Sequence, residues 1–228
     1  MKTLLLAAVA LGSFVGAQAT PAFASITVTD VEIPYNDVIG INTPSDIPYA
    51  GGEFYVGQFS LTTSVGQLAA WCIDLYHDIG LGSQSLHYAV GPITTNNDGT
   101  TLTGQQKSEM AGLITLGNIQ VAGDVASDNG HASDDAAAFQ LAIWSVEYPT
   151  FTYYNASSYV AAETITLVDE APTLQGSASA LVALNGQQGL ATSTTPDGGY
   201  PFLAPEPASL ALLGTSLFGL GLIRRRRA

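Results

Sequence analysis

The chain has 228 residues, of which 46% are hydrophobic, and it carries 6 basic against 19 acidic side chains. This hydrophobic content argues against a disordered protein, because disordered chains lack the apolar residues needed to form a core. Five of the basic residues lie near the two ends, so residues 25–204 keep only Lys107 against 18 acidic side chains. Such an acidic domain repels nucleic acid, which argues against nucleic acid as a partner.

The first 24 residues have the three parts of a secretory signal peptide. Lys2 gives a basic start, residues 4–15 are apolar, and Ala22-Phe23-Ala24 is a small-x-small cleavage site. Residues 17–19 form a second site of the same kind. We therefore expect signal peptidase to remove residues 1–24 and the mature chain to begin near Ser25.

Alternating apolar and polar residues predict four strands in the first part of the mature chain, at 26–33, 53–62, 68–77 and 85–94. The Pro, Asn, Asp and Gly residues of 34–52 predict a long loop. The glycine-rich turn at 80–83 predicts that the third and fourth strands form an antiparallel hairpin. In the third strand, the alternation places Cys72, Asp74 and Tyr76 on one face.

Helical periodicity replaces the alternation after residue 103. One helix is predicted over 104–117, ending at Gly117-Asn118, and a polar loop over 121–133. A second helix is predicted over 133–147, with Ser133 as its N-cap. Asp134 and Asp135 suit the first turn of that helix, and Pro149 follows its end.

Two weaker helical patterns follow at 156–165 and 173–184, and residues 186–203 predict a loop with room for one strand. Strands that precede helices favour an α+β domain. We therefore predict a single ectodomain over 25–203, in which an antiparallel β-sheet or sandwich is followed by a helical part.

The last 25 residues, 204–228, combine three features. Prolines on both sides of Glu206, in Pro205-Glu206-Pro207, favour an extended backbone. Residues 208–223 form an uncharged, largely apolar stretch, slightly short for a helix across a hydrocarbon core of about 30 Å. The four arginines Arg224, Arg225, Arg226 and Arg227 follow it, and such a cluster favours an orientation with the arginines cytoplasmic.

This C-terminal segment resembles the PEP-CTERM sorting tail of Gram-negative bacteria. The resemblance implies that exosortase, a membrane protease-transpeptidase, recognises Pro205, Glu206 and Pro207 and processes the protein. It implies that 208–223 is a transmembrane segment that anchors a precursor in the inner membrane. The protein would then reach the cell surface or the extracellular matrix.

Two blocks in the middle of the chain, Trp71-Cys72-Ile73-Asp74-Leu75 and Phe139-Gln140-Leu141-Ala142-Ile143-Trp144, resemble the thioester domains of bacterial surface adhesins. The resemblance implies that Cys72 supplies the sulfur and Gln140 the acyl carbon of an internal thioester, formed with loss of ammonia. A nucleophile on a surface or polysaccharide target would open it. Apolar neighbours such as Trp71 and Phe139 would keep water away from the bond.

Other interpretations stay open from the residues alone. Cys72, the single cysteine, cannot form an intrachain disulfide and could be a buried hydrophobe in a non-covalent structural matrix protein. A secreted cysteine hydrolase would need a histidine beside Cys72. His77, His87 and His131 are equal candidates for a general base.

The acidic residues between 124 and 135 do not follow the order of a calcium-loop motif, so a solvated loop is the simpler interpretation. We expect no metal and no cofactor. The sequence as a whole predicts an exported surface or matrix protein that does not turn over a substrate as an enzyme does.

Overall fold

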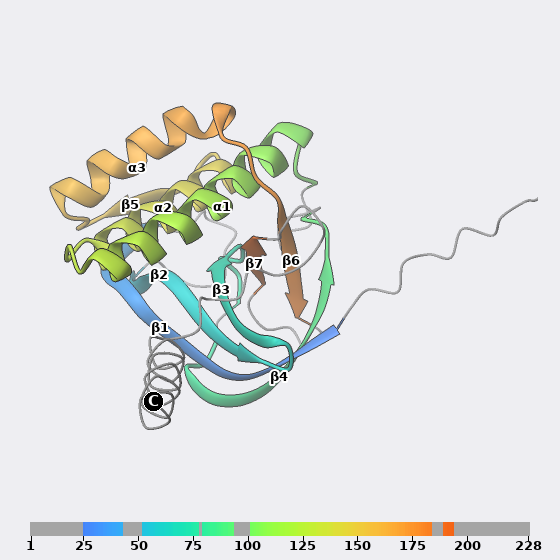
Figure 1. The fold of residues 1–228 in the computed structure, drawn as a ribbon. Helices are drawn as coiled ribbons and strands as arrows, with labels where there is room; N and C mark the ends of the chain where they lie inside the picture. The colour runs from blue at the N-terminus through green and yellow to red at the C-terminus, as the bar shows by residue number, and fades with distance from the viewer. Residues whose placement is uncertain (1–24, 43–51, 78, 94–100, 184–188, 194–228) are drawn as a thin grey trace, which may run out of the picture.

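The computed structural model describes residues 25–42, 52–77, 79–93, 101–183 and 189–193 (Figure 1). The predicted signal peptide and the predicted sorting tail lie outside the described residues. Within them the elements are β1 (Ser25–Asn42), β2 (Gly52–Thr63), β3 (Gly66–Cys72), β4 (Gly82–Gly91), α1 (Gly104–Ser127), α2 (Ala132–Glu147), β5 (Thr152–Tyr154), α3 (Ser158–Glu170), η1 (Ala171–Thr173), β6 (Ala178–Ala183) and β7 (Leu190–Ser193). The predicted α+β class is confirmed.

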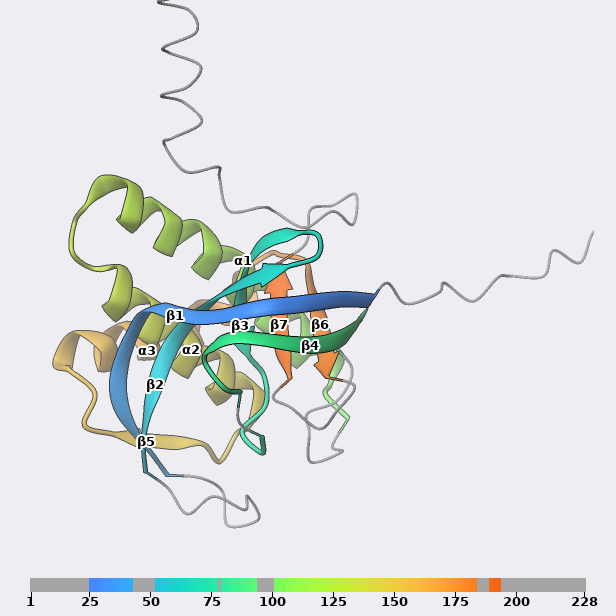
Figure 2. The same ribbon diagram turned by 90° about the horizontal axis from the view of Figure 1, so that it is seen from below.

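The described strands form one antiparallel sheet in the order β2-β3-β7-β6-β4-β1-β5. Because β1 pairs with β2 as well as with β4, the pairings of six strands close on themselves, and β5 joins the end of β1. Register shifts between Val28 and Asp30 and between Glu32 and Tyr35 mark irregularities at which a strand bends. Figure 2 shows β1 curving along the sheet, with β5 at its far end.

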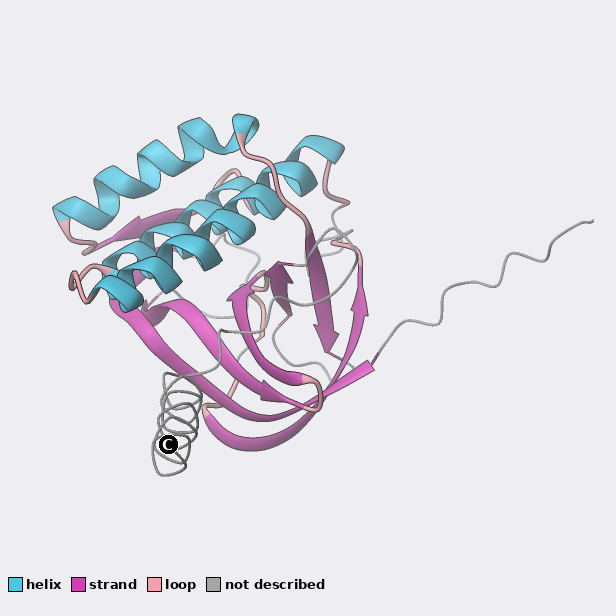
Figure 3. Cartoon of the chain, in the orientation of Figure 1, coloured by secondary structure: helices cyan, strands magenta, loops and turns pink. Residues whose placement is uncertain are grey.

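The helices gather on one side of the strands (Figure 3). Helix α2 lies between α1 and α3 and also contacts β1 and β2. Its residues from Asp135 to Trp144 are all buried, which is typical of a helix that is enclosed by neighbours. None of the helices within the described ranges is long and apolar enough to cross a membrane.

The predicted end of the first helix at Gly117-Asn118 is wrong, because α1 continues to Ser127 and occupies much of the predicted polar loop. Gly117 lets α1 approach closely, since an added Cβ would lie 2.8 Å from the ring of Trp71. The Asn118 side-chain oxygen accepts hydrogen bonds from Trp71 Nε1 at 2.8 Å and from Gln58 Nε2 at 2.9 Å. Tertiary contacts therefore use two residues that usually end helices.

The predicted hairpin between the third and fourth strands is also wrong. Strands β6 and β7 lie between β3 and β4, and β4 pairs instead with β1 and β6. The helix predicted over 173–184 is replaced by β6, whose residues pair on both sides with β4 and β7. The alanines of this segment favour a helix locally, and the pairing with both neighbouring strands overrides that preference.

Three boundaries also differ from the prediction. Residues 34–42 belong to β1 rather than to a loop, because they pair with β2 and β5. The third strand ends at Cys72, so residues 73–77 are not part of it. Helix α2 has His131, not Ser133, at its N-cap position, whereas Asp134 and Asp135 lie in its first turn as predicted.

Candidate functional site

A cavity of about 340 Å³ lies beside the end of β3. Its polar lining comes from Cys72, Asp74 and His77 at the end of β3 and beyond, and from Gln140 on α2. Apolar and aromatic side chains from β1, β2, α2 and the segment after β3 line the rest, among them Ile41, Phe54, Phe59, Leu81 and Trp144. Mostly apolar walls with a few convergent polar groups are typical of a binding or reactive site.

The structure brings Cys72 and Gln140 together from two elements that are far apart in sequence. The Cys72 N–H donates to Gln140 Oε1 at 2.8 Å, and Gln140 Nε2 donates to the Cys72 carbonyl oxygen at 2.9 Å. Both residues are 1% exposed. The side-chain carboxamide is thus held beside the Cys72 backbone inside the cavity wall. A covalent bond between the two side chains stays a prediction.

The Cys72 thiol is enclosed by the chain that follows it. Its Sγ donates to the Asp74 carbonyl oxygen at 3.1 Å and accepts from the Asp74 N–H at 3.4 Å. Burial raises the pKa of this thiol well above its ordinary value, and the nearby charges of Asp74 and Glu147 raise it further. The sulfur is therefore a protonated thiol at neutral pH, unlike the activated thiolate of a cysteine hydrolase.

Trp144 lies one helical turn after Gln140 and lines the same cavity. Its ring is 4% exposed and packs against Phe151, with ring centroids 5.6 Å apart. Its indole N–H has no hydrogen-bond partner of normal geometry in the described residues, but it lies near enough to the sulfur to lower the pKa of Cys72.

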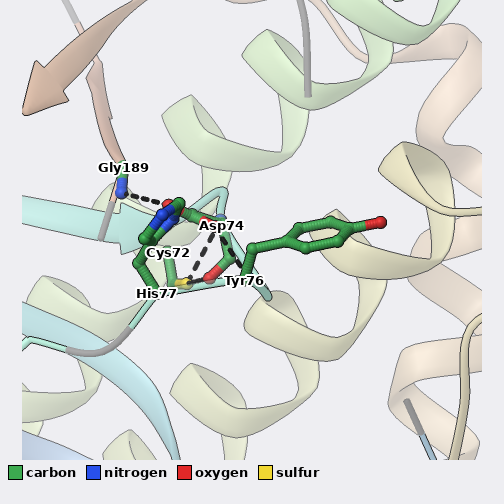
Figure 4. A network of polar contacts seen from close by, with 5 residues as sticks. All are labelled: Cys72, Asp74, Tyr76, His77 and Gly189. Carbon is green, nitrogen blue, oxygen red and sulfur yellow. Dashed lines mark hydrogen bonds and ion pairs between the residues drawn. The ribbon is translucent and has the colours of Figure 1, made fainter. Parts of the chain in front are cut away.

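Asp74 and His77 form a pair at the cavity that sequence reasoning missed. Asp74 is fully buried, and its carboxylate accepts hydrogen bonds from the N–H groups of Tyr76 at 2.8 Å and Gly189 at 3.0 Å. Its Oδ2 also lies 2.9 Å from Nδ1 of His77, whose side chain is 42% exposed (Figure 4). The Asp-x-x-His spacing directly after the Cys72 block was the available signal.

The other two histidines lie elsewhere. His87 on β4 contacts the Thr27 hydroxyl at 3.3 Å, and His131 stacks on Tyr159 with ring centroids 5.2 Å apart. Neither is among the residues that line the cavity. Of the three histidines that the sequence left equivalent, only His77 is therefore placed to act on a molecule held beside Cys72.

Two acidic residues near the turn between α1 and α2 lie among side chains that donate hydrogen bonds to them. Asp124 and Asp135 come together, but their neighbours are the amides of Gln120 and Asn129 and the Tyr159 hydroxyl. Across the described ranges, no group of three or more His, Cys, Asp or Glu side chains is placed to hold a metal ion.

The described residues thus define an α+β domain in which a buried cysteine and a buried glutamine meet at one cavity. Residues 203–227, beyond this domain, match the PEP-CTERM protein-sorting motif. This match includes Pro205, Glu206 and Pro207 and the arginines 224–227, and it confirms the predicted sorting signal. The motif implies an exported, surface-associated protein that exosortase processes. No curated protein and no solved structure matches the chain.

Proposed function

We propose that this exported protein attaches covalently to a surface target through an internal thioester between Cys72 and Gln140. The observation that carries the proposal is the buried pairing of the Gln140 carboxamide with the Cys72 backbone at 2.8 and 2.9 Å. In the reaction, Cys72 Sγ attacks Gln140 Cδ, a C–S bond forms, and the C–N bond breaks. The thiol proton leaves with the amide nitrogen as ammonia.

The surroundings of the pair suit a stored acylating group. The apolar cavity wall limits the access of water, which would hydrolyse the bond. The half-exposed His77 and the largely exposed Tyr55 lie on the same cavity, so a nucleophile can enter from the surface. The acyl group is used once and is then consumed. The protein is accordingly an adhesin rather than an enzyme with turnover.

A non-covalent matrix protein on the same fold is the second candidate, and one observation favours it. The two hydrogen bonds satisfy both the donor and the acceptor of the Gln140 side chain and tie α2 to β3. Such a contact stabilises the domain without any reaction, since a buried amide needs these partners in any case. The cysteine hydrolase is disfavoured by the raised pKa of Cys72.

Labelling with methylamine separates the two candidates. Methylamine should add to Gln140 of the mature protein and release a Cys72 thiol that then reacts with an alkylating reagent. Cys72→Ala and Gln140→Ala should each abolish the labelling, whereas Gln105→Ala, at an exposed position on α1, should not change it. A protein that takes up no methylamine, and whose thiol reacts with the alkylating reagent once the untreated protein is unfolded, would be the non-covalent matrix protein.

A further inference from the structure

We infer that His77, oriented by Asp74, is the general base that activates a hydroxyl group of the acceptor, so that the thioester esterifies polyols or saccharides. This inference rests on the proposed function, because it names the acceptor of the Cys72–Gln140 bond.

The first support is the fixed position of the Asp74 carboxylate. It is fully buried and accepts hydrogen bonds from the backbone N–H of Tyr76, two residues further along the chain, and of Gly189, which is 115 residues further along. These contacts leave Oδ2 directed at His77 Nδ1. A buried carboxylate accepts a hydrogen bond from a protonated Nδ1, so the neutral imidazole carries its free electron pair on Nε2. The ring is thereby prepared to take a proton.

The second support is the place of this ring. The chain folds back around the sulfur after β3, because the backbone N–H and C=O of Asp74 both contact Cys72 Sγ. His77 therefore lines the same cavity as Cys72 and Gln140 while 42% of its side chain stays exposed. A molecule that enters the cavity meets a wall to which His77 and Gln140 both contribute.

The third support is that hydroxyl and amine acceptors differ in their need for a general base. A neutral alcohol is a weak nucleophile and must lose its proton as it attacks, so a positioned base accelerates this step by about 10²–10⁴-fold. An unprotonated amine attacks a thioester without such help. Aromatic side chains on the cavity wall, Phe54, Tyr55 and Trp144, offer flat apolar surfaces that suit the carbon face of a sugar ring. A histidine–aspartate pair at this place is therefore of most use for a hydroxyl acceptor.

In the proposed step the acyl group moves from the Cys72 sulfur to the hydroxyl oxygen of the acceptor. The acceptor oxygen bonds to Gln140 Cδ while its proton passes to His77 Nε2. The Cδ–S bond breaks, and the Cys72 thiolate takes the proton from the imidazolium. The products are an ester at residue 140 and a free thiol at residue 72. His77 acts on the acceptor directly, and Asp74 is a positioning residue.

The test uses the mature full-length protein with glycerol as the hydroxyl probe and hydroxylamine as a nucleophile that needs no base. His77→Gln should slow the formation of the glycerol ester by about 10²–10⁴-fold, measured by mass spectrometry and by release of the thiol. Its reaction with hydroxylamine should stay within a few-fold of the wild type. His87→Gln, away from the cavity, should leave both reactions unchanged.

A second variant separates chemistry from structure. Added imidazole should restore glycerol ester formation in His77→Gly, because a free imidazole can take the place of the missing ring. Asp74→Asn should slow the glycerol reaction while hydroxylamine still opens the bond, since it alters the oxygen that faces His77 and the Gly189 N–H but leaves Cys72 and Gln140 in place. A purely structural role for His77 would show no rescue by imidazole.

Three further outcomes distinguish a failure of the role of His77 from a failure of the proposed thioester. If wild-type protein and His77→Gln both lack one ammonia but form the glycerol ester equally fast, the role of His77 is overturned and the proposed thioester stands. If only the variant fails to lose ammonia, His77 acts in forming the bond, and the inference as stated is wrong. If the wild type itself retains its ammonia and a reactive thiol, the proposed function and this inference both fail.

Discussion

At the scale of single residues, Trp144 connects the stability of the domain to the proposed chemistry. Its indole is almost fully buried between Phe151 and the cavity, one turn from Gln140. The ring forms part of the cavity wall beside the Cys72–Gln140 pair. Removal of the ring should therefore lower the free energy of unfolding and raise the rate at which water reaches the proposed thioester.

We predict that Trp144→Ala lowers the free energy of unfolding by about 3–5 kcal/mol, because it removes a large buried side chain and leaves a cavity. Urea unfolding of the two proteins measures this change. Val182→Ala, at a side chain that is 52% exposed, should change stability by less than about 0.5 kcal/mol. A Trp144→Ala protein as stable as the wild type would show that the ring does not pack as described.

The sequence pointed to Cys72 and Gln140 as the two residues of the site, but not to the Asp74–His77 pair beside them. The Trp71–Leu75 and Phe139–Trp144 blocks pointed to Cys72 and Gln140, and the structure places them in one cavity. The link between Asp74 and His77 has only the Asp-x-x-His spacing as a signal in the sequence, because its geometry depends on the strand ending at Cys72 and on Gly189 approaching from a distant segment. A strand continued to His77 would have spread these side chains over two faces.

At the scale of elements, a pair of carboxylates joins the three helices. Asp135 of α2 accepts a hydrogen bond from Tyr159 of α3 at 2.7 Å and lies beside Asp124 of α1, whose Oδ2 is buried without a partner in the described residues. Burial raises the pKa of Asp135, and the neighbouring Asp124 raises it further. Since a raised pKa means that folding favours the protonated form, this group adds stability at low pH. That contribution is lost as the pH rises through the raised pKa.

We predict that Asp135→Asn stabilises the domain at neutral pH by about 1 kcal/mol, because the amide can donate to Asp124 without a like charge. The gain should shrink towards zero below the ordinary pKa of aspartate, where the wild-type carboxyl is already protonated. Urea unfolding at neutral and at acidic pH measures both values. Asp134→Asn removes a charge from the same helical turn and serves as the control for the helix dipole. A neutral-pH loss of stability in Asp135→Asn alone would contradict the prediction.

The elements show where local patterns predict structure and where they do not. The alternation in 26–33 and 53–62 correctly predicted strands, and the helical period in 133–147 correctly predicted α2. In each of these segments the apolar residues that define the period are the ones that are mostly buried. Gly117 and Asn118 led to a wrong helix end in the prediction. In the structure Gly117 allows a close approach to the Trp71 ring, and the Asn118 side-chain oxygen accepts a hydrogen bond from Trp71 Nε1. The position of β6 and β7 between β3 and β4 depends on long-range pairing, which a local pattern does not contain.

At the scale of the whole molecule, an acidic domain is followed by a sorting signal at the C-terminus. The matched motif at 203–227 agrees with the predicted export and exosortase processing. A reactive thioester is useful only on a surface where it can meet a target, so sorting and chemistry support each other. The two can also be tested separately, since they depend on different residues.

We predict that Glu206→Ala keeps the protein in the inner membrane with residues 224–227 still attached, because we expect exosortase to recognise Pro205-Glu206-Pro207. Fractionation of an exosortase-containing host, followed by mass spectrometry of the C-terminus, measures this. Ser209→Ala, also within the matched residues, should be sorted as the wild type is. Wild-type protein recovered from the surface with its four terminal arginines would contradict the predicted processing.

The central claim is the bond between Cys72 and Gln140, and the intact mass of the mature protein tests it most directly. Wild type and Cys72→Ser should be purified from the same host under native conditions, so that the processed ends are identical and cancel in the comparison. We expect the wild type to be lighter by one ammonia than the substitution alone explains. Hydroxylamine should add once to the wild type, which replaces the deficit by an excess of one oxygen and releases the Cys72 thiol. A mass difference equal to the substitution alone, with a Cys72 thiol that titrates when the untreated protein is unfolded, would contradict the proposed bond.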